Sequence, residues 1–191
     1  MNPNTPSPRK GSPLLLVAII CVTLLTVGNL CLIFGFSGES REESGARSRR
    51  ITEEIARFAY SHFDDLPTAE QEQIVDRLHG LVRKAAHFAE FGLLGCLTAT
   101  LGRLLGLFFG WRVAVWQTAG TAAGFCLLTA VADETYQIFT HRGASPVDVC
   151  IDFCGGLCGV LLLHAVVWVW MLIRRKRRLR RATSRKEGAS L

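Results

Sequence analysis

Four long apolar segments constrain this chain more than any other feature. They cover about residues 14–36, 85–101, 113–132 and 147–173. An apolar helix of about 17 to 25 residues matches the hydrocarbon thickness of a bilayer. Lipid offers the backbone no hydrogen-bond partners, so only helices or closed barrels span it. The sequence therefore predicts an all-α integral membrane bundle of four transmembrane helices.

Polar tails flank the apolar segments and divide the chain into three parts. Residues 1–13 form a first tail, 14–173 a membrane domain and 174–191 a second tail, which is densely basic from Arg174 to Arg181. A basic run beside a span is typical of a cytoplasmic membrane flank. Nucleic-acid binding is the alternative, but the run directly abuts a span, so we expect no nucleic-acid partner.

The segment between the first two spans is polar and is expected to contain helices. Ile51, Ile55 and Phe58 have helical spacing and predict a short amphipathic helix. Thr68 with Gln71 resembles a capping box that opens a second helix, which can continue into the second span. These helices lie on the membrane surface or form a solvated connector. Residues 104–110 are expected to be a short apolar link.

Short basic flanks predict the orientation of the four spans. Arg9 with Lys10, Arg103 with Arg112, and the C-terminal run all fall on one side if the spans alternate. The positive-inside rule makes that side cytoplasmic. We therefore expect a multi-pass plasma-membrane protein with both termini inside. Residues 37–84 would form an extracytoplasmic helical loop, and 133–146 a shorter outer loop.

Ionisable residues and one glutamine gather where the second, third and fourth spans reach the outer side. Charged groups at this depth are costly and are a functional-site hypothesis by default. Helical spacing places several of them on shared faces, because residues three or four apart are neighbours on a helix. The cluster comprises Arg83, Lys84, His87, Glu90, Asp133, Glu134, Gln137, Arg142, Asp148 and Asp152.

One carboxylate at the start of the fourth span, Asp148, has a local structural explanation. Ser145 is suited to cap this helix, with Pro146 at its first position. Asp148 then lies in the first turn, where the helix dipole favours an anion. Asp152, one turn deeper, has no such structural reason.

Small residues within the spans predict close helix packing. Gly155 and Gly159, and likewise Gly120 and Gly124, form small-xxx-small pairs. We interpret His164 as an interhelical hydrogen-bonding residue. The cysteines Cys150, Cys154 and Cys158 share one helix face; we interpret them as small packing residues, with a metal or redox site as the alternative.

The polar residues carry a resemblance to the VanZ-like family of small membrane proteins. The matching motifs are R-K-x-x-H-F-x-E-[YF] from Arg83, D-E-x-x-Q from Asp133, R-x-x-x-x-x-D from Arg142 and D-x-x-G from Asp152. The resemblance covers roughly residues 14–173, and Phe91 stands where the family usually has Tyr. The family is named for a protein linked to resistance to the glycopeptide teicoplanin, which implies a role at the cell envelope.

Chemistry can then be assigned to the cluster as a site for an anionic molecule, such as a membrane lipid or a lipid-linked cell-wall precursor. Arg83, Lys84 and Arg142 suit phosphate or carboxylate, and Gln137, Asp148 and Asp152 complete the candidate ligand-binding set. The candidate catalytic residues are His87, Glu90, Asp133 and Glu134. No G-x-S-x-G or H-E-x-x-H motif occurs, so turnover is left open.

Two questions about the cluster stay open at the level of sequence. Asp133, Asp148 and Asp152 can ligate a divalent metal, with His87 either a neutral ligand or a protonated partner for anions; we favour the second. The cofactor and the oligomeric state are not specified. The alternative to a site is a non-catalytic structural or interaction protein, in which the same charges form an interhelical salt-bridge network. A transporter is disfavoured because no polar stripe continues to the cytoplasmic side.

Overall fold

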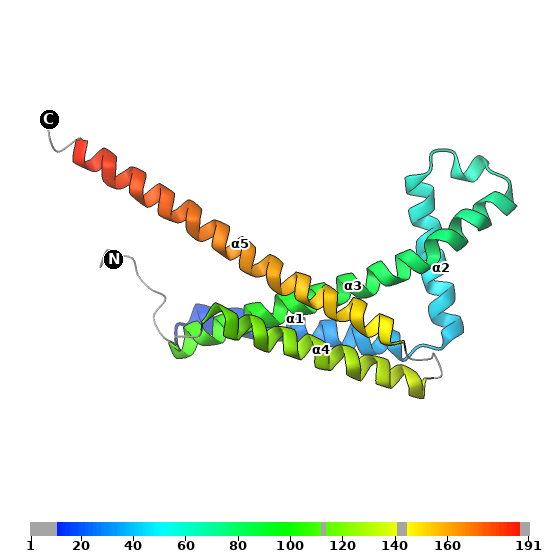
Figure 1. The fold of residues 1–191 in the computed structure, drawn as a ribbon, viewed down its shortest axis with the longest axis horizontal. Coiled ribbons are helices and arrows are strands. Elements are labelled where there is room, and N and C mark those ends of the chain that lie inside the picture. The colour runs from blue at the N-terminus through cyan, green and yellow to red at the C-terminus, as the bar shows by residue number, and fades with distance from the viewer. Residues whose placement is uncertain (1–10, 112–113, 141–144, 188–191) are drawn as a thin grey trace.

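The computed structural model describes residues 11–111, 114–140 and 145–187, with side chains as far as 178. All of its regular elements are helical (Figure 1): α1 (Pro13–Ser37), α2 (Arg41–Ala59), a 3-10 helix η1 (Phe63–Asp65), α3 (Thr68–Phe109), α4 (Val115–Phe139) and α5 (Pro146–Glu187). The helices α1, α3, α4 and α5 are each long and apolar enough to cross a membrane. The predicted all-α bundle of four spans is therefore confirmed.

Helix α3 (Thr68–Phe109) begins where the sequence predicts but ends later than expected. The expected link over residues 104–110 is wrong, because the helix continues to Phe109 and ends at Gly110, which adopts the left-handed conformation with φ 67°. The helix does begin at Thr68 and runs on into the span. The predicted capping box is wrong, however: Pro67 is the N-cap, and the Gln71 side chain donates to the Leu66 carbonyl oxygen at 2.9 Å.

Helix α2 and the first part of α3 form a hairpin that projects from one end of the bundle (Figure 1). Ala56, Phe63 and Val75 make its small apolar core. The predicted amphipathic helix is confirmed within α2, yet its apolar stripe points away from that core. Ile51 and Phe58 are 49% and 96% exposed. The stripe is therefore exposed on the outside of the hairpin. The expectation that it lies on the membrane surface stays a prediction.

Glycines bring α3 and α5 into backbone contact. A Cβ atom on Gly95 would lie 2.1 Å from the carbonyl oxygen of Gly156, and one on Gly155 would lie 2.3 Å from that of Phe88. The predicted packing role of Gly155 and Gly159 is therefore confirmed. For Gly120 and Gly124 the same prediction is wrong within this chain, since no described atom would come within 4 Å of a Cβ at either position.

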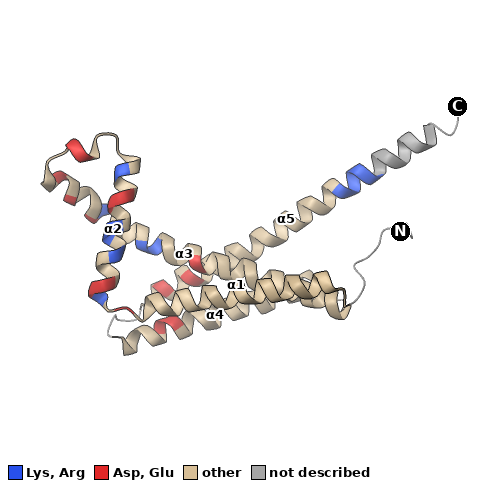
Figure 2. Ribbon diagram, turned by 180° about the vertical axis from the view of Figure 1, so that it is seen from behind, with Lys and Arg blue, Asp and Glu red and all other residues tan. Residues whose placement is uncertain are grey.

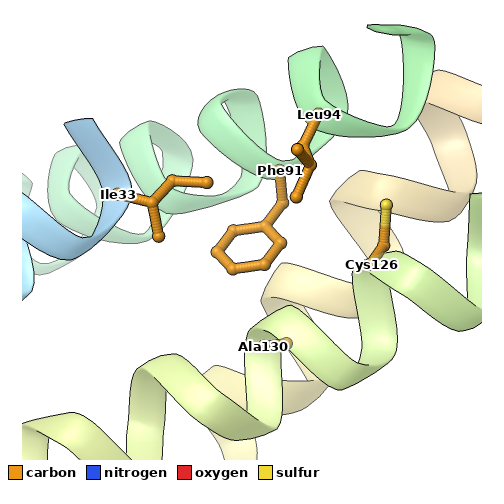
Figure 3. Packing of buried hydrophobic residues seen from close by; sticks show 5 residues of the cluster. All are labelled: Ile33, Phe91, Leu94, Cys126 and Ala130. Carbon is orange, nitrogen blue, oxygen red and sulfur yellow. The ribbon is translucent and has the colours of Figure 1, made fainter. Parts of the chain in front are cut away.

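An apolar cluster holds α1, α3 and α4 together beside the polar residues. Its members are Ile33, Phe91, Leu94, Cys126 and Ala130, with the Phe91 ring pointing between the helices (Figure 3). Phe91 is completely buried, so the position at which the resemblance leads us to expect tyrosine belongs to the core.

Two further predictions for α5 have opposite outcomes. His164 is an interhelical hydrogen-bonding residue, as predicted: Nε2 lies 3.3 Å from Thr118 Oγ1 on α4, and Nδ1 lies 2.8 Å from the Val160 carbonyl oxygen. The packing role of Cys150, Cys154 and Cys158 is wrong, because all three are exposed. They lie on the outer surface of the bundle.

Candidate functional site

A polar cavity of about 630 Å³ opens where the α2–α3 hairpin meets the end of the bundle. Its lining comes from the start of α2, the middle of α3, the end of α4 and the start of α5. Figure 2 shows acidic residues at this end of the bundle and a basic run at the far end of α5. The lining residues are Arg41, Ser44, Gly45, His79, Arg83, Lys84, His87, Gln137, Ser145, Val147 and Asp148.

The cationic side chains of α3 reach the cavity from its rim. The Arg83 side chain is 48% exposed, and its Nη2 lies 4.0 Å from Asp148 Oδ2. Asp148 lies in the first turn of α5, as predicted, so the helix dipole also stabilises its charge. A contact of this length between partly exposed groups is weak. Arg83 and Lys84 therefore keep donors available to a bound anion.

A set of buried polar side chains, which includes the cavity-lining Gln137, joins α1 and α4. Gln137 Nε2 donates to Asp133 Oδ2 at 3.0 Å and lies 3.4 Å from Ser37 Oγ, at the end of α1. Asp133 is 0% exposed. The one-turn spacing of Asp133 and Gln137 thus fixes the carboxylate in a defined orientation.

His87, Asp133 and Asp152 bring three helices together at one point. One potential ligand atom from each lies within 4.8 Å of the other two, and His87 Nδ1 is 3.7 Å from Asp152 Oδ1. One imidazole nitrogen and two carboxylate oxygens are donors that bind divalent cations. Of the predicted metal set, Asp133 and Asp152 belong to this group together with His87, whereas Asp148 lines the cavity at its rim. Metal binding itself stays a prediction.

The two remaining candidate carboxylates lie outside the lining of the cavity. Glu134 is buried, and its Oε2 accepts a hydrogen bond from the Ser145 backbone N–H at 2.8 Å, which ties the end of α4 to the start of α5. Glu90 is half-buried on α3. Their assignment to catalysis stays a prediction, as do the roles of the other candidate residues.

Sequence reasoning missed part of the cavity. His79 lies one turn before Arg83 on the same stripe of α3, so the spacing of 79, 83 and 87 was a usable signal. Arg41 and Ser44 had no such signal, because only the fold of the hairpin brings the start of α2 to the bundle. Arg142, an expected ligand-binding residue, lies outside the described residues.

The fold and the position of the cavity define a multi-pass helical membrane protein with a polar site at one end of its bundle. The chain matches the family model described as VanZ/LLP1 over residues 16–170. Because this match covers most of the sequence, the chain belongs to the VanZ/LLP1 family. No curated protein and no solved structure matches it.

Proposed function

We propose that the cavity binds the anionic group of a membrane lipid or lipid-linked cell-envelope molecule at the outer face of the plasma membrane. The observation that carries the proposal is the gathering of Arg41, Arg83 and Lys84 around one cavity. A guanidinium group can bind phosphate or carboxylate in a bidentate manner, and Lys adds a mobile point charge. Ligand sites typically enclose about 300–1,000 Å³, a range that includes this cavity.

The surroundings of the cavity favour a ligand that is anchored in the bilayer. The cavity lies at one end of the bundle of apolar helices, so a bilayer around that bundle would bring lipid head groups close to it. Helix α2 runs across this end of the bundle (Figure 1), and its exposed Ile51, Ile55 and Phe58 can enter the interface. The acyl or prenyl chain of such a ligand would remain in lipid while its head group enters the cavity.

The distribution of basic residues supports an outward-facing cavity. Arg103 lies near the end of α3, and residues 174–178 follow the apolar part of α5. Both are distant along their helices from the cavity-lining residues, and the positive-inside rule assigns such flanks to the cytoplasm. The VanZ resemblance suggests a cell-wall precursor as the ligand class and glycopeptide resistance as the wider context.

The alternative function is structural, and the pairs Arg83–Asp148 and His87–Asp152 favour it. In that case the charges would only join α3 to α5. The open cavity and the exposure of Arg83 and Lys84 favour ligand binding instead, because a closed network would leave neither feature. A catalytic step is not required by this geometry.

The test is binding of a long-chain prenyl phosphate to the full chain purified in detergent, with the matching neutral prenol as the comparison ligand. The double variant Arg83→Gln/Lys84→Gln should bind the phosphate about 10-fold or more weakly, since it loses two charge-assisted contacts. Arg175→Gln/Lys176→Gln makes the same charge change at the far end of α5 and should bind normally. Equal affinity for prenyl phosphate in the two double variants would refute an anion site at this cavity.

A further inference from the structure

Asp152 on α5 is a fully buried carboxylate. Its side chain is 0% exposed, and neither carboxylate oxygen has a hydrogen-bond partner among the described residues. Among the described residues, the positively chargeable group within 4.0 Å of it is His87, whose Nδ1 at 3.7 Å is beyond hydrogen-bond distance. Burying an ionised carboxylate without compensation costs several kcal/mol, about as much as breaking a buried pair. Such a group calls for a cation that completes the site.

The charges around Asp152 strengthen this requirement. Four other carboxylates are close enough to interact electrostatically with it: Asp133, Glu134, Asp148 and Glu90. Arg83 approaches Asp148 at the rim, and Glu134 accepts a backbone N–H from Ser145. Neither contact places a cation between Asp133 and Asp152. A divalent ion at that point would offset both of these charges at once.

We propose that His87, Asp133 and Asp152 bind a divalent first-row transition-metal ion, with open coordination positions toward the polar cavity. Each ligand comes from a different helix: α3, α4 and α5 respectively. Their donor atoms lie within 4.8 Å of one another. In a compact coordination shell, with bonds of about 2.0–2.2 Å, ligand atoms lie about 3–4 Å apart. The bound ion therefore needs only a small inward movement of these side chains.

The donor set indicates the kind of ion. A site of one imidazole nitrogen and two carboxylate oxygens suits Mn²⁺, Fe²⁺ or Zn²⁺, whereas Mg²⁺ and Ca²⁺ are bound mainly through oxygen. Three protein ligands leave at least one coordination position unfilled. His87 itself lines the cavity, as does Gln137, which donates to Asp133. The open position is therefore accessible from the cavity, where water or an anionic oxygen can fill it.

The neighbouring residues orient the ligands in the manner common at metal sites. Outer partners that hydrogen-bond to a ligating group fix its direction. Gln137 does this for Asp133, and Ser37 lies close to the same amide. The contact of Glu134 with Ser145 fixes the start of α5, which carries Asp152 two turns later. The site is thus held by contacts between the spans and stands independently of whether the cavity binds a lipid.

The test uses Mn²⁺ alone with untagged full-length protein in detergent, after chelator treatment and without any lipid ligand. Mn²⁺ is preferred to Zn²⁺ because Cys150, Cys154 and Cys158 are exposed thiols, and thiolates favour Zn²⁺. One ion should bind per chain, and its magnetic resonance spectrum should show coupling to an imidazole nitrogen. Asp152→Asn and His87→Gln should each weaken binding by about 10-fold or more, and His87→Gln should abolish the nitrogen coupling.

Matched controls separate this site from the rest of the cavity. His79→Gln changes the same residue type at the cavity lining and should bind Mn²⁺ like the wild type, whereas Asp148→Asn, which removes a nearby carboxylate that is not a ligand, should weaken binding much less than Asp152→Asn. In the ion-free state, Asp152→Asn should unfold at or above the wild-type temperature, because it removes a buried charge. Absence of Mn²⁺ binding, equal affinity in Asp152→Asn and Asp148→Asn, or preference for Mg²⁺ would each overturn the proposal. The Arg83→Gln/Lys84→Gln variant should keep the ion, so failure of the lipid proposal remains distinguishable.

Discussion

The carbonyl oxygen of Gly92 on α3 lies only 1.9 Å from the position that a Cβ atom on Gly159 of α5 would occupy. Cys96 Sγ also approaches the Gly159 carbonyl oxygen at 3.1 Å. The two backbones are thus in direct contact, which side chains larger than hydrogen would prevent. This contact sets the distance between the helix that carries His87 and the helix that carries Asp152.

We expect Gly159→Ala to destabilise the bundle by about 1–3 kcal/mol or more, because the added methyl group meets rigid backbone. The measurement is the free energy of unfolding in a mixed-detergent titration. Gly124→Ala is the control, since no described atom lies within 4 Å of its added Cβ. Alanine also favours the helix by about 0.5–1 kcal/mol over glycine. Equal destabilisation by the two substitutions would contradict the packing described for α3 and α5.

Sequence reasoning identified the spans because their signal is local. A long apolar run predicts a membrane span whatever the tertiary structure around it. Ser145 with Pro146 likewise correctly marks the start of α5. The apolar residues 104–109 were misassigned because an apolar helix end and an apolar link share the same composition. In the structure these residues are helical, and the helix ends at the left-handed Gly110.

The site was less accessible to sequence reasoning than the fold. Periodicity placed Arg83 and His87 on one stripe, and topology placed Asp133 and Asp152 at the same end. The sequence could not show that Asp152 lies near His87 while Asp148 lies at the cavity rim near Arg83, because these positions depend on the rotation of α5 about its axis. Backbone contacts at Gly155 and Gly159 fix this rotation, and they are tertiary information.

The pair Arg83–Asp148 should contribute little to stability. Its atoms are 4.0 Å apart and Arg83 is about half exposed, so solvent screens the interaction. In a double-mutant cycle with Arg83→Gln and Asp148→Asn, we expect a coupling free energy of at most about 1 kcal/mol. The measurement is again unfolding in detergent. A coupling of about 3 kcal/mol or more would support the structural network over an open ligand site.

The start of α2 should be sensitive to acid. Ser40 Oγ donates to Glu43 Oε2 at 2.8 Å and the Ser40 N–H donates at 3.1 Å, and these contacts hold the pKa of Glu43 below its ordinary value of 4.5. A lowered folded-state pKa stabilises the helix above the unfolded value and loses that effect as pH falls through the folded value. Hydrogen exchange at the first turn of α2, corrected for intrinsic rates, should show protection decreasing on acidification below 4.5.

Ser40→Ala provides the control for this titration. It removes the hydroxyl that accepts from the Glu43 N–H and donates to Glu43 Oε2, and it leaves the backbone N–H contact to Glu43 in place. Protection should therefore already be reduced at neutral pH and should change less with acid. Identical pH curves for Ser40→Ala and the wild type would show that the cap does not control α2.

The orientation of the bundle can be measured in intact spheroplasts. An epitope tag after Leu191 should be protected from antibody, and a cysteine introduced at the exposed Glu42 should react with a membrane-impermeant thiol reagent. The positive-inside distribution of Arg103 and residues 174–178 is the physical reason. The chain without the introduced cysteine is the control for labelling of the native cysteines. A labelled C-terminal tag with an unreactive residue 42 would place the cavity in the cytoplasm.

Gln137 should act as a positioning residue for the proposed ion, because its amide orients Asp133 at 3.0 Å. Gln137→Leu removes that donor and should lower Mn²⁺ affinity by about 10- to 100-fold, the range for loss of an outer hydrogen bond at a metal site. Thr140→Val is the matched control: Thr140 Oγ1 donates to the Ser37 carbonyl oxygen at 3.1 Å, so the change also breaks an α1–α4 contact but leaves Asp133 oriented. Unfolding and Mn²⁺ titration are measured on both variants. If Thr140→Val lowered the Mn²⁺ affinity as much as Gln137→Leu, the effect would come from helix packing, and Gln137 would have no specific role in orienting Asp133.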